Sequence, residues 1–260
     1  MAFDKHDLAQ LRRAKELLEN PGLAAKFSAV LGSPLEKGMK MLPAKWQKTV
    51  HGATEAAIMK ALNVAVTSLG RKRGGTSNDR LHRFAAAASG AAGGAFGIAA
   101  IGIELPLSTT LILRSIAEIA AAEGEDPRQI ETKLACITVF ALGSTKDKRD
   151  NAAESGYFAA RAALASAVSE ATKFLAEKGL GKSGAPALVR LIALIASRFG
   201  VVVSQKAAAQ MVPVIGAAGG AIINTLFIGH YQDMARGHFI VRRLEKIHGA
   251  EPVRLAYEKA

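Results

Sequence analysis

The chain has 260 residues and a formal net charge of +12; half of its residues are hydrophobic, but only 5% are aromatic. Most of the apolar content is Ala, Leu, Ile and Val, and 8 Pro are present, which favours an all-α fold because Ala and Leu form helices well. Such a positive charge indicates an anionic partner, either nucleic acid or an acidic membrane surface. Nucleic-acid binders interleave aromatic residues with basic runs, and no such run occurs here, so we expect no nucleic-acid partner.

The cysteine content and the N-terminal residues limit the kinds of site and the cellular location that we expect. The single Cys136 lies in an apolar run, which excludes an internal disulfide and a cysteine-based metal cluster. The first ten residues include Asp4 and Asp7 and contain no apolar signal-peptide segment. We therefore expect a cytoplasmic protein that associates peripherally with the membrane, and we expect no cofactor.

Hydrophobic periodicity predicts helices along most of the chain. In order, the expected helical segments are 1–35 (broken at Asn20-Pro21-Gly22), Leu42–Leu69, Phe84–Ile103, Glu131–Gly143, Asn151–Lys178 and Ala187–Gln210. A polar, glycine-rich stretch at 71–78 is the best candidate boundary between basic amphipathic N-terminal helices (1–80) and a Gly-rich helical core (81–260). Pro106 is expected to break or kink the chain, with Ser108 or Thr109 capping the next helix.

The hexapeptide GAAGGA occurs twice, at 90–95 and at 216–221, and an Arg-containing motif and a Pro follow each copy. The Pro stands 37 residues after the first glycine in one copy (position 127 minus 90) and 36 in the other (252 minus 216). This spacing predicts an internal repeat covering 84–133 and 211–259. Glycines four residues apart let helices approach closely, as in a glycine zipper. We expect a multi-helix bundle with two Gly-rich helical pairs packed in its centre.

Two uncharged runs, 84–103 and 212–229, are 20 and 18 residues long, which is the length of a bilayer span. They consist largely of Ala and Gly, which contribute little free energy of transfer into lipid. Three interpretations follow from these runs. The segments span the membrane, they associate with its surface reversibly or insert conditionally, or they are buried helices of a soluble protein.

The strongest candidate site residues are titratable groups in or beside these runs. Glu104 and His230 each stand 14 residues after the first glycine of their repeat unit, and Asp233 and His238 follow on the same segment as His230. A hydrolase-like centre for a lipid or apolar substrate would use Glu104, His230 and Asp233. A metal site would need Glu104, His230 and His238, although their spacing matches no known metal motif. A hydrogen-bonded helix end is the simpler interpretation.

Further charges interrupt apolar segments, where a charge is costly unless it is paired. They predict a buried polar network that orients the helices, formed by Glu104, Arg114, Glu118, Arg161, Arg190 and Arg198. Arg114 and Glu118 stand four residues apart, so they can pair on one helical face.

Basic residues around the only tryptophan suggest a contact with lipid headgroups. The expected contact residues are Lys45, Trp46, Lys48, Arg71, Lys72 and Arg73. Trp lies favourably at a membrane interface, and each Lys or Arg near an anionic surface contributes about 1 kcal/mol.

Five strings occur together in this chain: IELPLSTTLILRSIAEIA (103–120), LACITVFALG (134–143), YFAARAAL (157–164), LVRLIALIASRFGVVVSQKAAAQ (188–210) and VPVIGAAGGAIINTLF (212–227). Together they resemble the bacterial EcsC family, although this chain reads FALGS where members often read FALGG. The resemblance implies a bacterial protein, in some species encoded beside an ABC transporter, and it implies no catalytic residue. We expect a membrane-surface or lipid-associated helical protein, with an enzyme on an apolar substrate or a soluble scaffold docking on an ABC transporter as alternatives.

Overall fold

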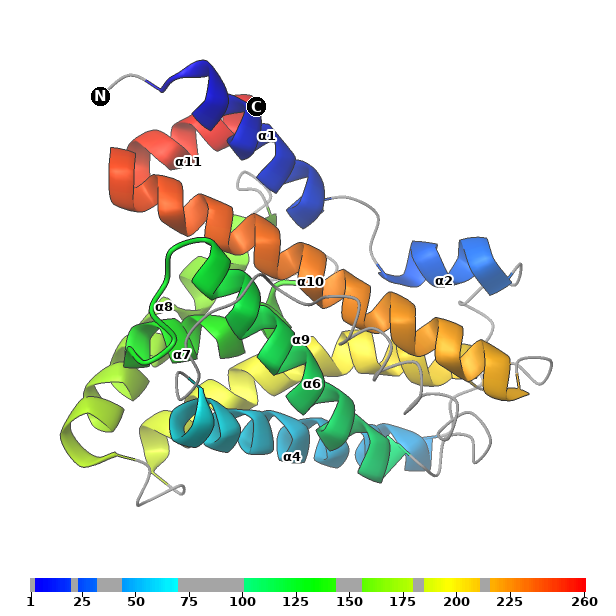
Figure 1. The fold of residues 1–260 in the computed structure, drawn as a ribbon. Helices are drawn as coiled ribbons and strands as arrows, with labels where there is room; N and C mark the ends of the chain where they lie inside the picture. The colour runs from blue at the N-terminus through cyan, green and yellow to red at the C-terminus, as the bar shows by residue number, and fades with distance from the viewer. Residues whose placement is uncertain are drawn as a thin grey trace.

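The computed structural model describes residues 3–19, 23–31, 44–69, 101–143, 156–179, 185–210 and 216–260. Their helices are α1 (Lys5–Glu19), α2 (Leu23–Leu31), α4 (Ala44–Ser68), α6 (Ile101–Ala122), α7 (Ile130–Thr138), the short 3-10 helix η2 (Val139–Ala141), α8 (Gly156–Lys178), α9 (Pro186–Gln210), α10 (Gly216–His248) and α11 (Ala250–Lys259) (Figure 1). No strand occurs in these ranges, which confirms the prediction of an all-α, multi-helix bundle.

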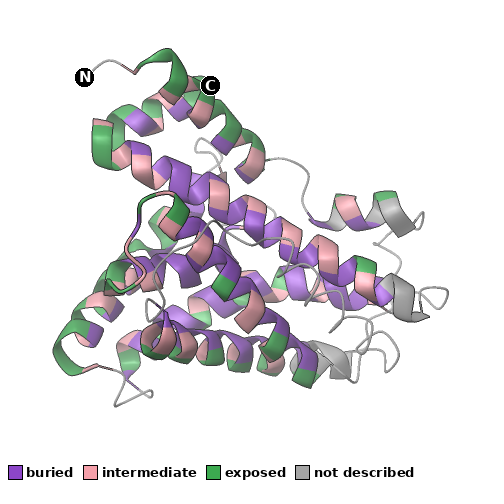
Figure 2. Cartoon of the chain, viewed as in Figure 1, coloured by how far each residue is buried: buried purple, intermediate pink, exposed green. Residues whose placement is uncertain are grey.

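The longest helix, α10, is the centre of the bundle, and α1, α2, α6, α9 and α11 all pack against it. Figure 2 shows that most of α10 is buried. Its Phe227 and Tyr231 meet Phe199 of α9 and Phe140 of η2 in a cluster of rings with centroids 5.1 to 6.0 Å apart. Such edge and tilted ring contacts add to the free energy of apolar burial. Aromatic packing midway along α10 therefore fixes the position of this helix against α9 and η2.

The N-terminal helix α1 packs against the two C-terminal helices, α10 and α11. The His248 Nε2 atom lies 2.6 Å from a carboxylate oxygen of Asp7, and Lys15 donates to the Glu258 carbonyl. A Cβ atom at Gly237 of α10 would lie 2.6 Å from Leu18 Cγ, so this glycine is required for the close approach of α1. One hydrophobic core includes side chains from α1 through α11, and the domain boundary expected near residue 80 lies outside the described residues.

The sequence-based expectation is that Pro106 breaks or kinks the helix, and the structure shows that it does not break it. Helix α6 begins at Ile101 and continues through Pro106 to Ala122. A proline at this position leaves the carbonyl of Gly102 without its helical donor, but Gly102 is exposed, so water can satisfy that carbonyl. Ser108 is not a helix cap, because its hydroxyl donates to the Leu105 carbonyl one turn earlier.

Helix α6, which follows the first GAAGGA copy, and helix α10, which begins with the second, pack along each other. Gln232 donates to the Ser115 hydroxyl over 2.8 Å, and both residues are buried. Each helix is followed by a glycine with positive φ, Gly124 at 86° and Gly249 at 88°, a conformation that glycine adopts without strain. The first GAAGGA copy and the side chains 216–219 of the second lie outside the described residues, so the glycine zipper stays a prediction.

Candidate functional site

The most deeply buried charges are an ion pair between α6 and α9. Lys206 Nζ lies 2.6 Å from a carboxylate oxygen of Glu104, and the side chains are 0% and 5% exposed. Gln210 donates to the second carboxylate oxygen over 3.3 Å, and the ammonium group lies 4.6 Å from the centre of the Phe227 ring. Burial lowers the pKa of Lys206, while the charge of Glu104 and its hydrogen bond act to raise it. Since each charge is costly to bury alone, the pair holds α6, α9 and α10 together.

Large apolar side chains are exposed close to this ion pair. Ile103 and Leu107, on one face of α6, are 84% and 50% exposed, Val201 of α9 is 41% exposed and Ile222 of α10 is 46% exposed. Each lies within five residues along its helix of Glu104, Lys206 or Phe227, and Lys206 contacts both Glu104 and Phe227. We call these four side chains the apolar end of the bundle. The start of α6 and the start of α10 lie toward the same side in Figure 1, and Figure 2 shows exposed positions at the start of α6.

Two described helices are long and apolar enough to cross a membrane by length and composition, Gly102–Ala122 and Pro186–Gln210. The uncharged run 84–103 lies outside the described residues except for its last three, and the run 212–229 is described only from 216. About half of each is buried inside the protein, as is usual for core helices of soluble proteins. The structure is thus compatible with membrane association.

The candidate catalytic residues contact different partners. Glu104 contacts Lys206 and Gln210, whereas His230 Nε2 donates to the Gly143 carbonyl over 3.2 Å. Burial, and to a smaller extent the charge of Lys26, lowers the pKa of His230 to about 4, so this imidazole is neutral at pH 7. No contact joins Glu104 to His230 among the interactions of the described residues, so the geometry does not support a centre built on these two groups.

Asp233 holds α2 against α10. Its carboxylate lies 3.1 Å from Lys26 Nζ and 3.5 Å from Arg236 Nη1 on the next turn. The side chain of Asp233 is 28% exposed, as expected for a partly solvated ion pair. Its role in the structure is therefore helix docking.

His238 belongs to a buried chain of hydrogen bonds between α8 and α10. Arg161 donates to both carboxylate oxygens of Glu245, at 2.8 and 2.9 Å, and to the Tyr157 hydroxyl oxygen at 3.2 Å. That hydroxyl lies 2.9 Å from His238 Nδ1. Because Arg161 can only donate, the Tyr157 proton has His238 Nδ1 as its sole acceptor among the described residues. Nδ1 is then the acceptor, and in the neutral ring Nε2 carries the proton.

Electrostatics keep His238 neutral. Burial, together with the charges of Arg161 and Arg242, places its pKa well below the ordinary value. The Nε2 atom is buried and has no hydrogen-bond partner in the described part of the chain. An unpaired buried donor costs about 1–3 kcal/mol. His238 Nε2 is one of seven buried side-chain N or O atoms without a hydrogen-bond partner among the described residues, and of their residues only His238 also lines the cavity described next.

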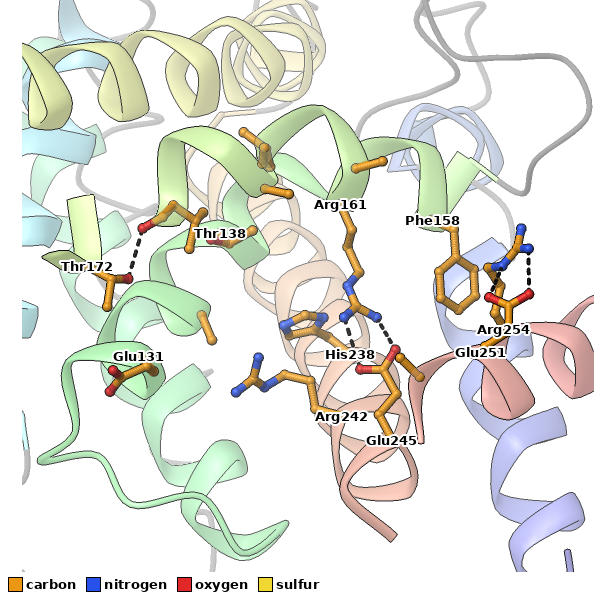
Figure 3. A pocket seen from close by; sticks show the side chains of 16 residues that line it. Glu131, Thr138, Phe158, Arg161, Thr172, His238, Arg242, Glu245, Glu251 and Arg254 are labelled. Carbon is orange, nitrogen blue, oxygen red and sulfur yellow. Dashed lines mark hydrogen bonds and ion pairs between the residues drawn. The ribbon is translucent and has the colours of Figure 1, made fainter. Parts of the chain in front are cut away.

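A cavity of about 540 Å³ lies beside this chain, lined by residues of α7, α8, α10 and α11. We call it the α8–α10 cavity. His238, Arg161 and Arg242 line one part, and Phe158, Leu164 and Val168 supply apolar wall (Figure 3). In Figure 3 the His238 ring lies between the guanidinium groups of Arg161 and Arg242. Sequence reasoning missed Tyr157, Arg242 and Glu245, and Arg242 entered only as a landmark of the repeat.

The residues considered for a metal site do not come together, since no three His, Cys, Asp or Glu side chains form a possible metal site among the described residues. Glu104, His230 and His238 are instead bound to Lys206, Gly143 and Tyr157.

The predicted buried network exists only in part. Glu104 is buried and Arg161 is half-buried, each in an ion pair, whereas Arg114 and Arg190 are exposed, contrary to expectation. Arg190 reaches Glu170 of α8 from a position that is 60% exposed. The physical reason is that a long apolar helix on the outside of a bundle has one face in water, and the charges alone did not show which residues lie on that face. Glu118 and Arg198 are half-buried.

The expected headgroup contacts cannot be placed. The side chains of Lys45, Trp46 and Lys48, in the first turns of α4, and the stretch 71–73 lie outside the described residues.

Comparison with known proteins gives one assignment. A family model described as the EcsC protein family matches residues 5–244, which is 240 of the 260 residues. No curated protein and no solved structure matches the chain. The matched range includes the buried ion pair, Tyr157, Arg161 and His238, and most of the helices that line the α8–α10 cavity; Glu245 is the first residue beyond it. The chain therefore belongs to the EcsC protein family.

Proposed function

We propose that the protein binds anionic membrane surfaces peripherally, through the apolar end of the bundle. The observation that carries this proposal is the exposure of Ile103 and Leu107 on one face of α6, beside a fully buried ion pair. Large apolar side chains exposed together, as Ile103 and Leu107 are one turn apart on α6, are typical of an interaction surface. Transfer of one such side chain from water to an apolar environment contributes about 1.5–3 kcal/mol when it is complete.

The net charge supports a membrane as the occupant of this surface. The chain carries a formal charge of +12, and each Lys or Arg near an anionic lipid surface contributes about 1 kcal/mol. The two contributions together are sufficient for reversible attachment, in the way that an apolar anchor and a basic region act together in peripheral proteins.

Arg114 argues against a spanning arrangement. It is exposed and lies ten residues after Glu104 on α6, close to the middle of the span-length segment Gly102–Ala122. An arginine at the centre of a lipid-facing helix costs about 2.5–3.5 kcal/mol even on favourable scales. Peripheral contact of the first turns of α6 leaves Arg114 in water.

Vesicle flotation tests the proposal. We expect the protein to float with vesicles of anionic lipid and to remain in the dense fraction with neutral lipid, with recovery falling at high salt because screening weakens the attraction. The Ile103→Glu/Leu107→Glu double variant should lose flotation. The matched control is Ile247→Glu/Leu255→Glu, because these two side chains are 54% and 45% exposed on α10 and α11. Equal recovery with both lipids, no flotation, or equal loss in both variants overturns the proposal.

A further inference from the structure

We propose that the α8–α10 cavity binds a single-chain amphiphile, with His238 and Arg242 holding its anionic head. This site lies apart from the apolar end: His238 follows Phe227 by eleven residues, which is about 16 Å along α10. A ligand here is therefore a second, independent binding function.

The first argument is the set of unused donors at the cavity wall. The Nε2–H group of His238 is buried without a partner. Arg242 donates through Nε to Glu125 over 3.0 Å, and its two Nη atoms have no acceptor among the residues that the structure describes. A carboxylate or a phosphate offers several acceptor oxygens, and arginine binds such groups with two parallel hydrogen bonds. An incoming anion would satisfy the imidazole and the guanidinium together.

The second argument is the balance of charge around these donors. Two cations, Arg242 and Lys246, lie at 3.0 and 2.9 Å from one carboxylate, that of Glu125, so this group keeps one excess positive charge. Although burial alone would raise it, Lys246 and Arg242 hold the pKa of Glu125 below its ordinary value. The carboxylate of Glu245 is already bound by Arg161. Of the other two acidic lining residues, Glu251 is bound by Arg254 and Glu131 is exposed to solvent. An anion between His238 and Arg242 therefore meets the excess positive charge of Arg242 and Lys246.

The third argument is the shape and polarity of the remaining wall. The cavity volume of about 540 Å³ lies within the range of roughly 300–1,000 Å³ that small-molecule sites occupy. Phe158, Leu164 and Val168 line it beyond the polar groups, and exposed Ala162 and Ala165 of α8 lie at its opening. An anion without an apolar portion would leave this wall against water, whereas one alkyl chain would cover it.

The test is calorimetric titration of the full-length protein with soluble probes below their micelle concentrations. We expect dodecanoate or dodecyl phosphate to bind, and the comparison of the two shows whether the head is a carboxylate or a phosphate. Dodecanol, dodecyltrimethylammonium, acetate and inorganic phosphate should bind much more weakly. Binding of dodecanol as tight as that of the anions, or of inorganic phosphate as tight as that of dodecyl phosphate, overturns the proposal, as does no binding of either anionic probe.

The protein offers a matched pair of variants. Arg242→Gln should weaken binding about 10- to 100-fold, the range for losing a charged hydrogen-bonding partner. Arg243→Gln is the control, because Arg243 is the next residue, is similarly half-buried and makes a similar ion pair to Glu123 at 3.0 Å, but does not line the cavity. Equal weakening by both variants contradicts the assignment of Arg242.

A spectroscopic readout on the wild-type protein does not depend on the Arg242→Gln variant. In ¹⁵N-labelled wild-type protein, the anionic probe should shift the His238 Nε2–H resonance as the atom gains an acceptor, with the signal identified by its loss in His238→Gln. An unchanged resonance at saturating probe refutes the site. Flotation of Arg242→Gln with anionic vesicles should equal that of the wild type, so failure of the cavity proposal and failure of the membrane proposal are distinguishable.

Discussion

The buried ion pair of Glu104 and Lys206 predicts strong thermodynamic coupling between α6 and α9. Replacing Glu104 with Leu leaves a lysine that is 0% exposed without its anion. The lysine can escape the cost of a buried charge only by losing its proton. The ordinary lysine pKa of 10.5 lies 3.5 pH units above pH 7. Deprotonating the lysine at pH 7 therefore costs about 5 kcal/mol, which is the upper limit on the loss of stability. We expect Glu104→Leu to lower the free energy of unfolding by about 3–5 kcal/mol.

The second single variant and the double variant complete the cycle. Lys206→Met should cost somewhat less, about 3 kcal/mol, because Gln210 still donates to the Glu104 carboxylate over 3.3 Å. The double variant Glu104→Leu/Lys206→Met replaces both charges with apolar groups of similar size, a change that is often neutral or stabilising. The coupling energy should therefore exceed about 3 kcal/mol. Urea unfolding followed by circular dichroism at neutral pH measures all four proteins, and additivity within about 0.5 kcal/mol would refute the reasoning.

Three further outcomes follow from the structure. Gly237→Ala should destabilise by about 1–2 kcal/mol in urea unfolding although Ala is the better helix former, because its methyl group would overlap Leu18; stabilisation would show that α1 does not pack as described. Gly143→Ala should cost about 1–3 kcal/mol, because its Cβ would occupy the position of His230 Nε2, and a neutral effect would contradict that contact. Below about pH 6.5 the unfolded chain protonates His230 and His238, while the fold holds them neutral, so the free energy of unfolding should fall by about 2 kcal/mol for each histidine between pH 6.5 and 5. The His230→Gln variant should remove about half of this loss. An unchanged dependence of the free energy of unfolding on pH in that variant would contradict a buried neutral His230.

Periodicity and composition predicted the helices well because each has apolar residues at helical spacing. The start of α9 and the end of α8 at Lys178 agree with the predicted segments to within one residue. Pro106 is an exception to the rule that a proline inside a helix breaks it. A proline six residues into α6 is tolerated because the carbonyl that it leaves unpaired belongs to an exposed residue, and exposure is a property of the fold.

The candidate site was less predictable. The charge of Glu104 in an apolar segment marked it as a candidate, but its partner Lys206 lies 102 residues away and no local spacing indicates the pairing. The repeat suggested that Glu104 and His230 are equivalent, whereas in the structure each binds a different element. The series of hydrogen bonds from Glu245 through Arg161 and Tyr157 to His238 joins α8 and α10. It forms only when the two helices are rotated so that these side chains face one another, and the sequence contains no information on that rotation.

The central claim is that the apolar end contacts lipid, and a fluorophore at Ile103 measures this directly. Cys136 is fully buried and burial raises the pKa of its thiol to about 12, so a cysteine introduced at position 103 can be labelled selectively with an environment-sensitive dye. Ile247 is the matched control, 54% exposed and 25 residues from Ile222 along α10, or about 37 Å. With anionic vesicles, we predict a blue shift for the label at Ile103→Cys and none for that at Ile247→Cys. No shift at position 103, or equal shifts at both positions, would contradict the account.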